Sequence, residues 1–227
     1  MMHVPFQVEA RIPSGRVVLP DPWSCMLDGL LAAVVLKDRL GANYGYSAGV
    51  VELQPGDLPL EAWSHGDEWW FAATAPIHAD EPDVDTDWLV GRQDTYNARL
   101  YCPDLPKSIQ TQGGRYRNTR TPVPVTLTER LVWRGIGDVD AVMDLLSRVD
   151  SVGARRGAGF GIVTGWAVEQ LATDVGMWRD AYPGPTRPLP AAYAAEQGFT
   201  TEPIPCPLTP PYHATKEPRH TQVAARW

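Results

Sequence analysis

The sequence predicts an α+β fold in which four strands alternate with two helices. Two segments repeat apolar side chains at helical spacing, and four segments have the alternating or β-branched pattern of strands. The segments follow one another in the order strand, helix, strand, strand, helix, strand. A chain of 227 residues with 44% hydrophobic side chains is long enough to bury a core around these elements.

The first strand and the first helix are predicted near the N-terminus. Residues 3–12 alternate well enough for a half-buried strand. The helix is predicted over residues 24–40, with Ser24 as its N-cap and Gly41 as its stop. Its apolar positions recur at helical spacing and form one buried stripe: Met26, Leu27, Leu30, Leu31, Val34 and Val35.

The remaining elements complete a single sheet. Strands are predicted over residues 67–75, 123–134 and 161–170, and the second helix over 138–150 with Asp138 as its cap. The order βαββαβ is that of a ferredoxin-like (RRM-like) domain, which is one antiparallel sheet with both helices on the same face.

The predicted domain spans residues 1–171 and contains a long insertion. Residues 78–122 lack convincing periodicity, begin with an acidic stretch and end with a basic one. An irregular connection of this length inside a compact domain is usually functional or disordered. Residues 172–227 are dense in proline, which predicts an extended segment that lies over the surface without a core of its own. We expect this tail or a partner to cover one of the two tryptophans at 69–70.

The net charge of −7 is unevenly distributed along the chain. Residues 1–90 hold 4 basic and 14 acidic side chains, whereas residues 91–165 hold 11 basic and 7 acidic ones. The middle third is therefore where we expect a polyanion to bind. The three cysteines form no CxxC pair, which favours a reducing cytoplasm over a zinc site, and we expect neither a signal peptide nor a membrane span.

A glycine-rich loop between the second helix and the last strand is the strongest functional signal. The stretch GARRGAGFG, residues 153–161, combines four glycines with two adjacent arginines. Its position after a helix and before a strand excludes the dinucleotide fingerprint, and the absence of a Lys-Ser or Lys-Thr pair excludes Walker A. The alternative is a structural turn that merely ends the helix.

We expect this loop and the end of the insertion to contact the phosphates of an extended strand. Arginine pairs with phosphate through a fork of donors, and a tyrosine between two arginines suits base stacking. The candidate RNA-binding residues are Arg148, Gly153, Arg155, Arg156, Gly157, Gly159, Phe160, Gly161, Lys107, Arg115, Tyr116, Arg117 and Arg120.

Three stretches resemble the RAMP superfamily of CRISPR–Cas systems. They are LDGLLA (27–32), YRNTRTPVPVTL (116–127) and the longer block 135–169 that spans helix, glycine-rich loop and strand. More narrowly, the chain resembles the small RAMP subunit of type IV effector complexes. The resemblance implies a subunit that binds the 5′ handle of crRNA, contacts the backbone RAMP subunit and the large subunit, and uses residues 78–122 as a thumb.

Related subunits cleave RNA without metal, so the resemblance also makes His3, Tyr44, Tyr46 and His65 nominal catalytic candidates. We expect no catalytic residue, because no histidine has a partner at a recognised spacing. We also expect no cofactor or metal, since the acidic residues 80–87 lack EF-hand spacing and are predicted to form a solvated loop. A crRNA-processing endoribonuclease and an anion-binding regulatory domain remain as alternatives.

Overall fold

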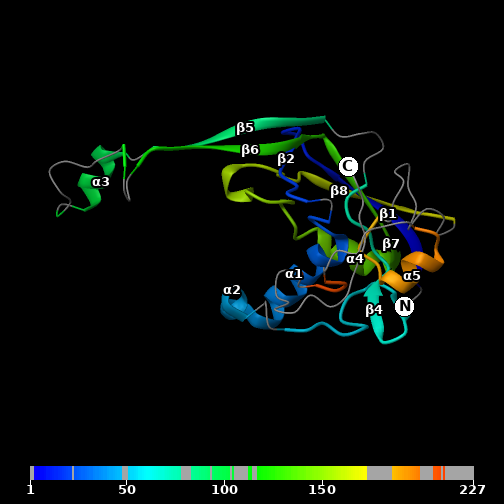
Figure 1. Cartoon of the computed structure of the whole chain (residues 1–227). Coiled ribbons are helices and arrows are strands. Elements are labelled where there is room, and N and C mark those ends of the chain that lie inside the picture. Colours follow the sequence, from blue (N-terminus) through cyan, green and yellow to red (C-terminus); the bar gives the residue numbers. More distant parts are fainter. Residues whose placement is uncertain are drawn as a thin grey trace.

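The described residues form a mixed α and β body from which one long hairpin projects (Figure 1). The computed structural model describes residues 3–21, 23–47, 51–77, 83–92, 94–102, 104, 112–113, 117–172, 186–199, 207–210 and 212. Helices and antiparallel sheets occur together, which confirms the predicted α+β class.

The main sheet has β1 (Val4–Arg11) at its centre, with β7 (Arg130–Gly137) on one side and β8 (Gly165–Gln170) on the other. Both pairings are antiparallel, and Val8 lies opposite Trp133 in β7 and Val168 in β8. The prediction that residues 3–12 and 161–170 share an antiparallel sheet is confirmed, and the end of the predicted strand 123–134 joins them as part of β7.

The predicted strand over residues 67–75 is wrong in its pairing. β4 (Glu68–Phe71) pairs with β3 (Ala62–His65) in a separate hairpin, because Gly66 turns the chain with a φ of +61°. The chain beyond β4 then reaches the outer edge of β7 through isolated bridges at Ala73 and Ile77. The chain thus bridges to β7 on both sides of that hairpin, at Leu60 before it and at Ala73 and Ile77 after it.

The predicted strand over residues 123–134 is two strands. β6 (Thr119–Leu127) and β7 belong to different sheets, with a corner between them at Thr128. There the Thr128 N–H donates to the carbonyl of Gly15, and the hydroxyl donates to the carbonyl of Arg130. Apolar residues alternate up to Leu127 and resume at Leu131, so the short polar stretch between them was interpreted as part of one strand.

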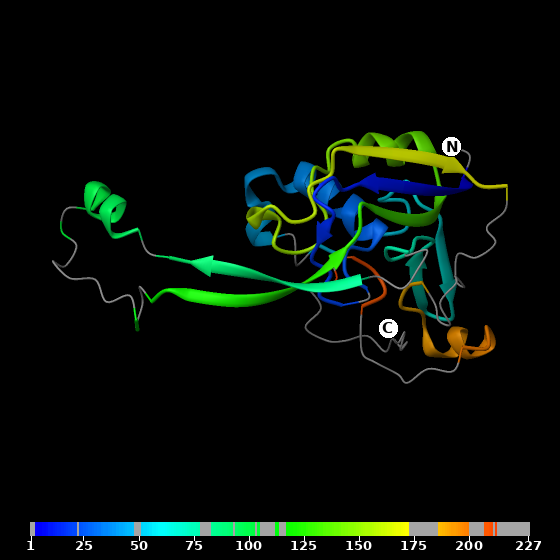
Figure 2. The ribbon, with the colours of Figure 1, turned by 90° about the horizontal axis from the view of Figure 1, so that it is seen from above.

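The insertion contains a long hairpin. β5 (Asp83–Gly91) pairs with β6 along its whole length, the short β2 (Arg16–Val17) pairs with the end of β6, and α3 (Thr95–Tyr101) lies near the far end (Figure 2). The solvated loop predicted for the acidic segment is thus wrong for residues 83–87, which alternate Asp with Val and Thr and form a strand. Aspartate is depleted in strands, so three aspartates in five residues favoured the prediction of a loop.

The two predicted helices lie on one side of the main sheet (Figure 1). Their observed bounds are Leu27–Leu40 for α1 and Val139–Leu146 for α4, and α1 continues into η1 (Gly41–Asn43) and α2 (Tyr44–Ser47). Asp138 caps α4 as predicted, with its carboxylate 3.1 Å from the N–H of Ala141. Ser24 does not cap α1, because its hydroxyl accepts instead from the N–H of Asp21.

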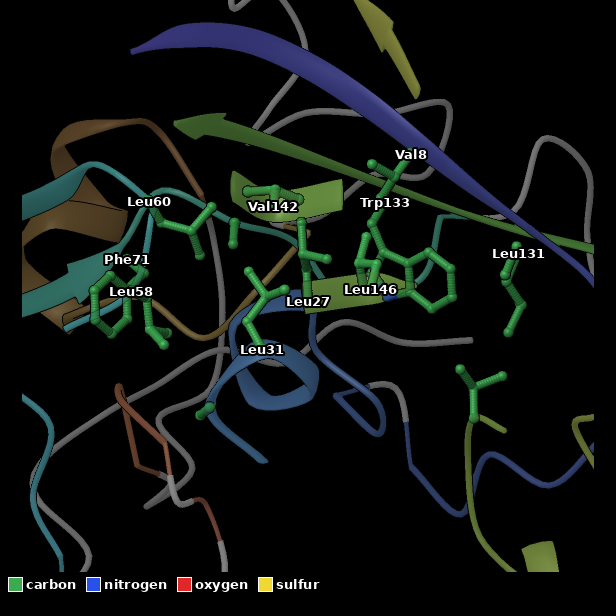
Figure 3. Packing of buried hydrophobic residues seen from close by; sticks show 14 of the residues in the cluster. Val8, Leu27, Leu31, Leu58, Leu60, Phe71, Leu131, Trp133, Val142 and Leu146 are labelled. Atoms are coloured by element: carbon green, nitrogen blue, oxygen red, sulfur yellow. The ribbon is translucent and has the colours of Figure 1, made fainter. Parts of the chain in front are cut away.

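The main core fills the space between this sheet and the two helices (Figure 3). Val8, Leu131 and Trp133 from the sheet meet Leu27 and Leu31 from α1. Val142 and Leu146 of α4 complete the contact, all fully or almost fully buried. Removal of these apolar surfaces from water is the main force that holds helices to sheet.

The segment beyond residue 171 is less extended than predicted. It contains α5 (Ala191–Glu196), and Leu189, Ala194 and Leu208 pack with Trp70 in a second hydrophobic cluster. Trp70 is 1% exposed, so the prediction that the tail covers one tryptophan of the pair is confirmed. The cluster joins side chains of this segment to tryptophans of the body, and the domain division at residue 172 stays a prediction.

A buried arginine joins this C-terminal segment to the body. The Arg187 side chain is fully buried and donates to the carbonyls of Phe71, Ala73 and Leu208. It also lies 3.4 Å from the carboxylate of Asp28 in the first turn of α1. Burial raises the pKa of Asp28, and the neighbouring charge of Arg187 opposes that rise. Three distant parts of the chain are thus held by one guanidinium.

Replacement of Arg187 by methionine is expected to lower the free energy of unfolding by about 3–5 kcal/mol, because it leaves the Asp28 carboxylate buried without a positive charge beside it. Urea denaturation measures the loss, and Asp28→Asn in the same background should recover part of it. Arg39→Met, which breaks the exposed ion pair with Asp57, is the control and should have a much smaller effect. A wild-type midpoint for Arg187→Met would contradict this role.

Candidate nucleic-acid interface

The glycine-rich loop lies between α4 and β8, as predicted, and is bonded to the start of the hairpin. The Ala154 N–H donates to the carbonyl of Val18 at 2.8 Å, and the Gly161 N–H donates to that of Arg16 at 2.9 Å. Ser151 and Ile162 form an isolated bridge that closes the loop. The loop therefore has a fixed base beside β2.

Gly153 and Gly161 serve this base. Both have a positive φ, +77° and +65°, which L side chains rarely adopt. A Cβ at Gly153 would lie 2.6 Å from the carbonyl oxygen of Val18, and one at Gly161 would overlap the carbonyl of Val152. A structural turn is therefore sufficient to explain why glycine occupies these two positions.

Gly157 and Gly159 differ from them. A Cβ at either position would meet no atom within 4 Å, so close packing does not require glycine there. Gly157 lies in η4 (Arg156–Ala158), and Gly159 follows with a φ of +89°. Both are exposed. The middle of the loop is thus an open ridge with almost no side chains, which another molecule could approach closely.

Two adjacent arginines lie at the start of this ridge. Arg155 and Arg156 are exposed, and within the described part of the chain neither guanidinium has a hydrogen-bond or ion-pair partner. Arg155 has a φ of +56°, an uncommon conformation for a residue with a side chain. The loop therefore presents two unpaired guanidiniums beside accessible backbone, an arrangement suited to phosphate.

The other predicted loop residues have partners inside the protein. Phe160 is 6% exposed and packs with Val18, Val123 and Val125, so it anchors the loop to β6. Arg148 donates two hydrogen bonds to Asp38 of α1, at 2.7 and 2.5 Å, and these bonds lower the pKa of Asp38. Neither side chain is as available to a ligand as Arg155 or Arg156.

The predicted residues of the insertion are only partly described. Arg117 is exposed just before β6, whereas Lys107, Arg115 and Tyr116 lie outside the described residues. Arg120 stacks over the indole ring of Trp88, with 4.0 Å between the guanidinium carbon and the ring centroid. Sequence analysis missed Trp88, and the alternation of DTDWLV around it was the available signal.

Cys25 lies beneath the loop, a position that no sequence pattern indicated. Burial raises the pKa of its thiol to about 11, although a hydrogen bond from the backbone of Gly153 and the charge of Arg156 oppose the rise. The Cys25 backbone has a φ of +66°, and its carbonyl accepts from the indole N–H of Trp133 at 2.9 Å. The thiol is therefore a packing group under the loop.

The nominal catalytic residues are not assembled into a site by any described contact. His65 lies 3.1 Å from Glu196 and 5.6 Å from the ring of Tyr193, both in the C-terminal segment. His3 is exposed, Tyr44 packs partly against the main core, and the Tyr46 side chain is not described. Among the described residues no group of three or more His, Cys, Asp or Glu side chains could hold a metal ion.

Comparison with known families identifies the chain. Residues 91–224 match the family of CRISPR type IV associated protein Csf3. The matched region covers more than half of the sequence and includes the second half of the hairpin, the glycine-rich loop and α5. The chain belongs to this family and is a CRISPR type IV associated protein.

No curated protein matches the chain. None of the helices formed by the described residues has the length and apolar character needed to cross a membrane.

The packed glycines, Gly153 and Gly161, and the open Gly157 should respond differently to replacement by alanine. Gly153→Ala and Gly161→Ala should lower the free energy of unfolding by about 1–3 kcal/mol, because both force a side chain into a left-handed, crowded position. Gly157→Ala is the matched control and should leave stability close to wild type. Thermal unfolding of the three variants checks this, and equal losses at all three would contradict the division.

The thiol of Cys25 is predicted to resist alkylation in the folded chain. With its pKa raised to about 11, almost no thiolate is present at pH 8, whereas Cys102 is exposed. Iodoacetamide labelling followed by peptide mass spectrometry should therefore modify Cys102 first, and Cys25 only after unfolding in urea. Rapid labelling of Cys25 under native conditions would show that the loop does not cover it.

Proposed function

We propose that this chain is a non-catalytic RNA-binding subunit of a type IV CRISPR–Cas ribonucleoprotein complex, in which the glycine-rich loop holds the 5′ handle of the crRNA. The observation that carries the proposal is the pair of exposed guanidiniums of Arg155 and Arg156 on the open ridge, which have no partner among the described residues. Membership of the type IV family supports the type of complex.

The chemistry of the ridge favours a strand of phosphates over a small anion. Two adjacent guanidiniums can each contact a different phosphate, and the open backbone at Gly157 and Gly159 leaves room for the sugar-phosphate chain. A small metabolite would need an enclosed pocket to replace its hydration shell. The exposure of the ridge therefore favours RNA over a regulatory anion.

The proposal includes the architecture on which the loop is mounted. We propose that β1, α1, the bridged segment around residues 73–77, β7, α4 and β8 are a ferredoxin-like core, because the bridges add this segment beside β7. The β5–β6 hairpin would then be the thumb, which leans over RNA, with Arg117 in reach of the strand. The subunit would cap the filament of backbone RAMP subunits and contact the large subunit.

The proposed role is holding RNA rather than cutting it. The loop has no histidine, tyrosine, lysine or carboxylate between residues 153 and 161 that could move a proton. His65, the histidine with a described partner, is paired with Glu196 rather than with a candidate of the loop. No specific contact favours the endoribonuclease alternative.

Replacement of Arg155 and Arg156 by alanine is expected to weaken binding to every 5′-handle RNA alike, because phosphate contacts do not distinguish bases. The slope of log K against log salt should become shallower by about 1.4, since each lost phosphate contact removes about 0.7. Fluorescence anisotropy across a salt series measures both, and thermal unfolding should remain unchanged.

Two variants control this experiment. Lys37→Ala with Arg39→Ala removes the same charge from the exposed end of α1 and should leave the salt slope close to wild type. Gly157→Val should lower affinity without loss of stability, because it blocks only the approach to the ridge. An unchanged slope in the double arginine variant would make the loop a structural turn. Cleavage of a labelled repeat RNA without metal would reject the non-catalytic role.

A further inference from the structure

The β5–β6 hairpin has two faces of different chemistry. Side chains directly opposite each other in the paired strands share a face. One face, here called the Trp88 face, combines alternate residues of β5 with their partners in β6: Val84, Thr86, Trp88, Val90, Arg120, Pro122, Pro124 and, next to β2, the buried Thr126. The other carries Asp83, Asp85 and Asp87, with Leu89 and the buried pair Val123 and Val125.

The Trp88 face is apolar and open. Val84 is 68% exposed, Val90 54% and Trp88 44%, and both prolines are exposed. The hairpin extends away from the body in both views, so no described element lies beside its outer half (Figures 1 and 2). A row of exposed large apolar side chains along a ribbon is uncommon on a protein that acts alone and marks an interaction surface.

Charge is distributed unequally between the two faces. The three carboxylates of β5 all lie on the opposite face, where Asp87 pairs with Arg16 at 2.8 Å. Arg120 is the one charged side chain among the eight residues of the Trp88 face, and its guanidinium stacks on the indole. The face is thus an apolar strip with a single cation on its tryptophan.

We propose that the Trp88 face is the docking surface for another protein subunit of the same ribonucleoprotein. The partner would present an apolar surface with a carboxylate placed to meet Arg120. Tryptophan and arginine are the residues most often found at the energetic centre of protein interfaces, and here they are in contact. This inference rests on the proposed function only in that the partner is a protein of the same complex.

The same observations disfavour RNA as the occupant. An RNA strand needs several cations along its path, and this face has one. Arg120 already covers a face of the indole on which a base could stack. Although Arg120 was a sequence candidate for RNA binding, its contact with Trp88 assigns it to this docking surface.

A second copy of the chain fits the face poorly as well. In a symmetric pair the same patch meets itself, so each Arg120 would enter an apolar interface that has no carboxylate to receive it. A different protein can supply that carboxylate. Charge complementarity therefore selects a heterologous partner.

The test uses the complex itself. The tagged full chain is co-expressed with the other protein subunits of its type IV complex and a crRNA, purified by the tag, and treated with ribonuclease. Trp88→Ala, Val90→Ser and Arg120→Glu should each reduce the protein subunits retained by about tenfold or more. Asp85→Ser, an exposed residue of the opposite face, is the matched control and should retain them fully.

Separate measurements on the isolated chain distinguish the other occupants. Trp88→Ala should leave the melting temperature unchanged and the affinity for 5′-handle RNA within about twofold of wild type. Loss of subunit binding would then be independent of RNA binding by Arg155 and Arg156. Full retention of the subunits by all three variants would overturn the proposal. Lower RNA affinity in Trp88→Ala, or a wild-type dimer in light scattering that Trp88→Ala abolishes, would instead identify RNA or a second copy as the occupant.

Discussion

The backbone of residues 16–18 is hydrogen-bonded on two sides, and the candidate interface depends on it. On one side Arg16 and Val17 pair with the end of β6, and on the other the carbonyls of Arg16 and Val18 accept from the glycine-rich loop. Val17 is buried in the main core, whereas Val18 packs with Phe160 and β6. A three-residue segment thus fixes the loop, the hairpin and the body relative to one another.

Arg187 has a comparable role on the other side of the molecule. A buried guanidinium is costly unless its donors are matched, and here carbonyls from β4, the following chain and the C-terminal segment receive them. Because these acceptors come from separate segments, the arrangement forms only when all are in place. The C-terminal residues therefore contribute to the fold at the start of α1.

Periodicity predicted the elements of the core and failed where the chain changes sheets. The spacing of Leu27, Leu31, Val142 and Leu146 marked both helices, and Asp138 marked a cap. It did not show that Thr128 is a corner, because the apolar pattern that ends at Leu127 resumes only four residues later at Leu131. The glycine-rich loop was found as a whole. The division between its packed and open glycines could not be predicted, because it depends on the carbonyls of Val18 and Val152. Val18 is distant in sequence, and Val152 approaches Gly161 only when the loop closes.

The length of the hairpin sets a minimum size for anything that touches both the loop and the tip. β5 has nine residues, and an antiparallel strand advances about 3.4 Å per residue, so its ends are roughly 30 Å apart. A mononucleotide or a short fragment cannot span that distance. Under the proposed function, an RNA that touches both places has to be at least this long, so the protein would discriminate between intact and degraded RNA by reach rather than by sequence.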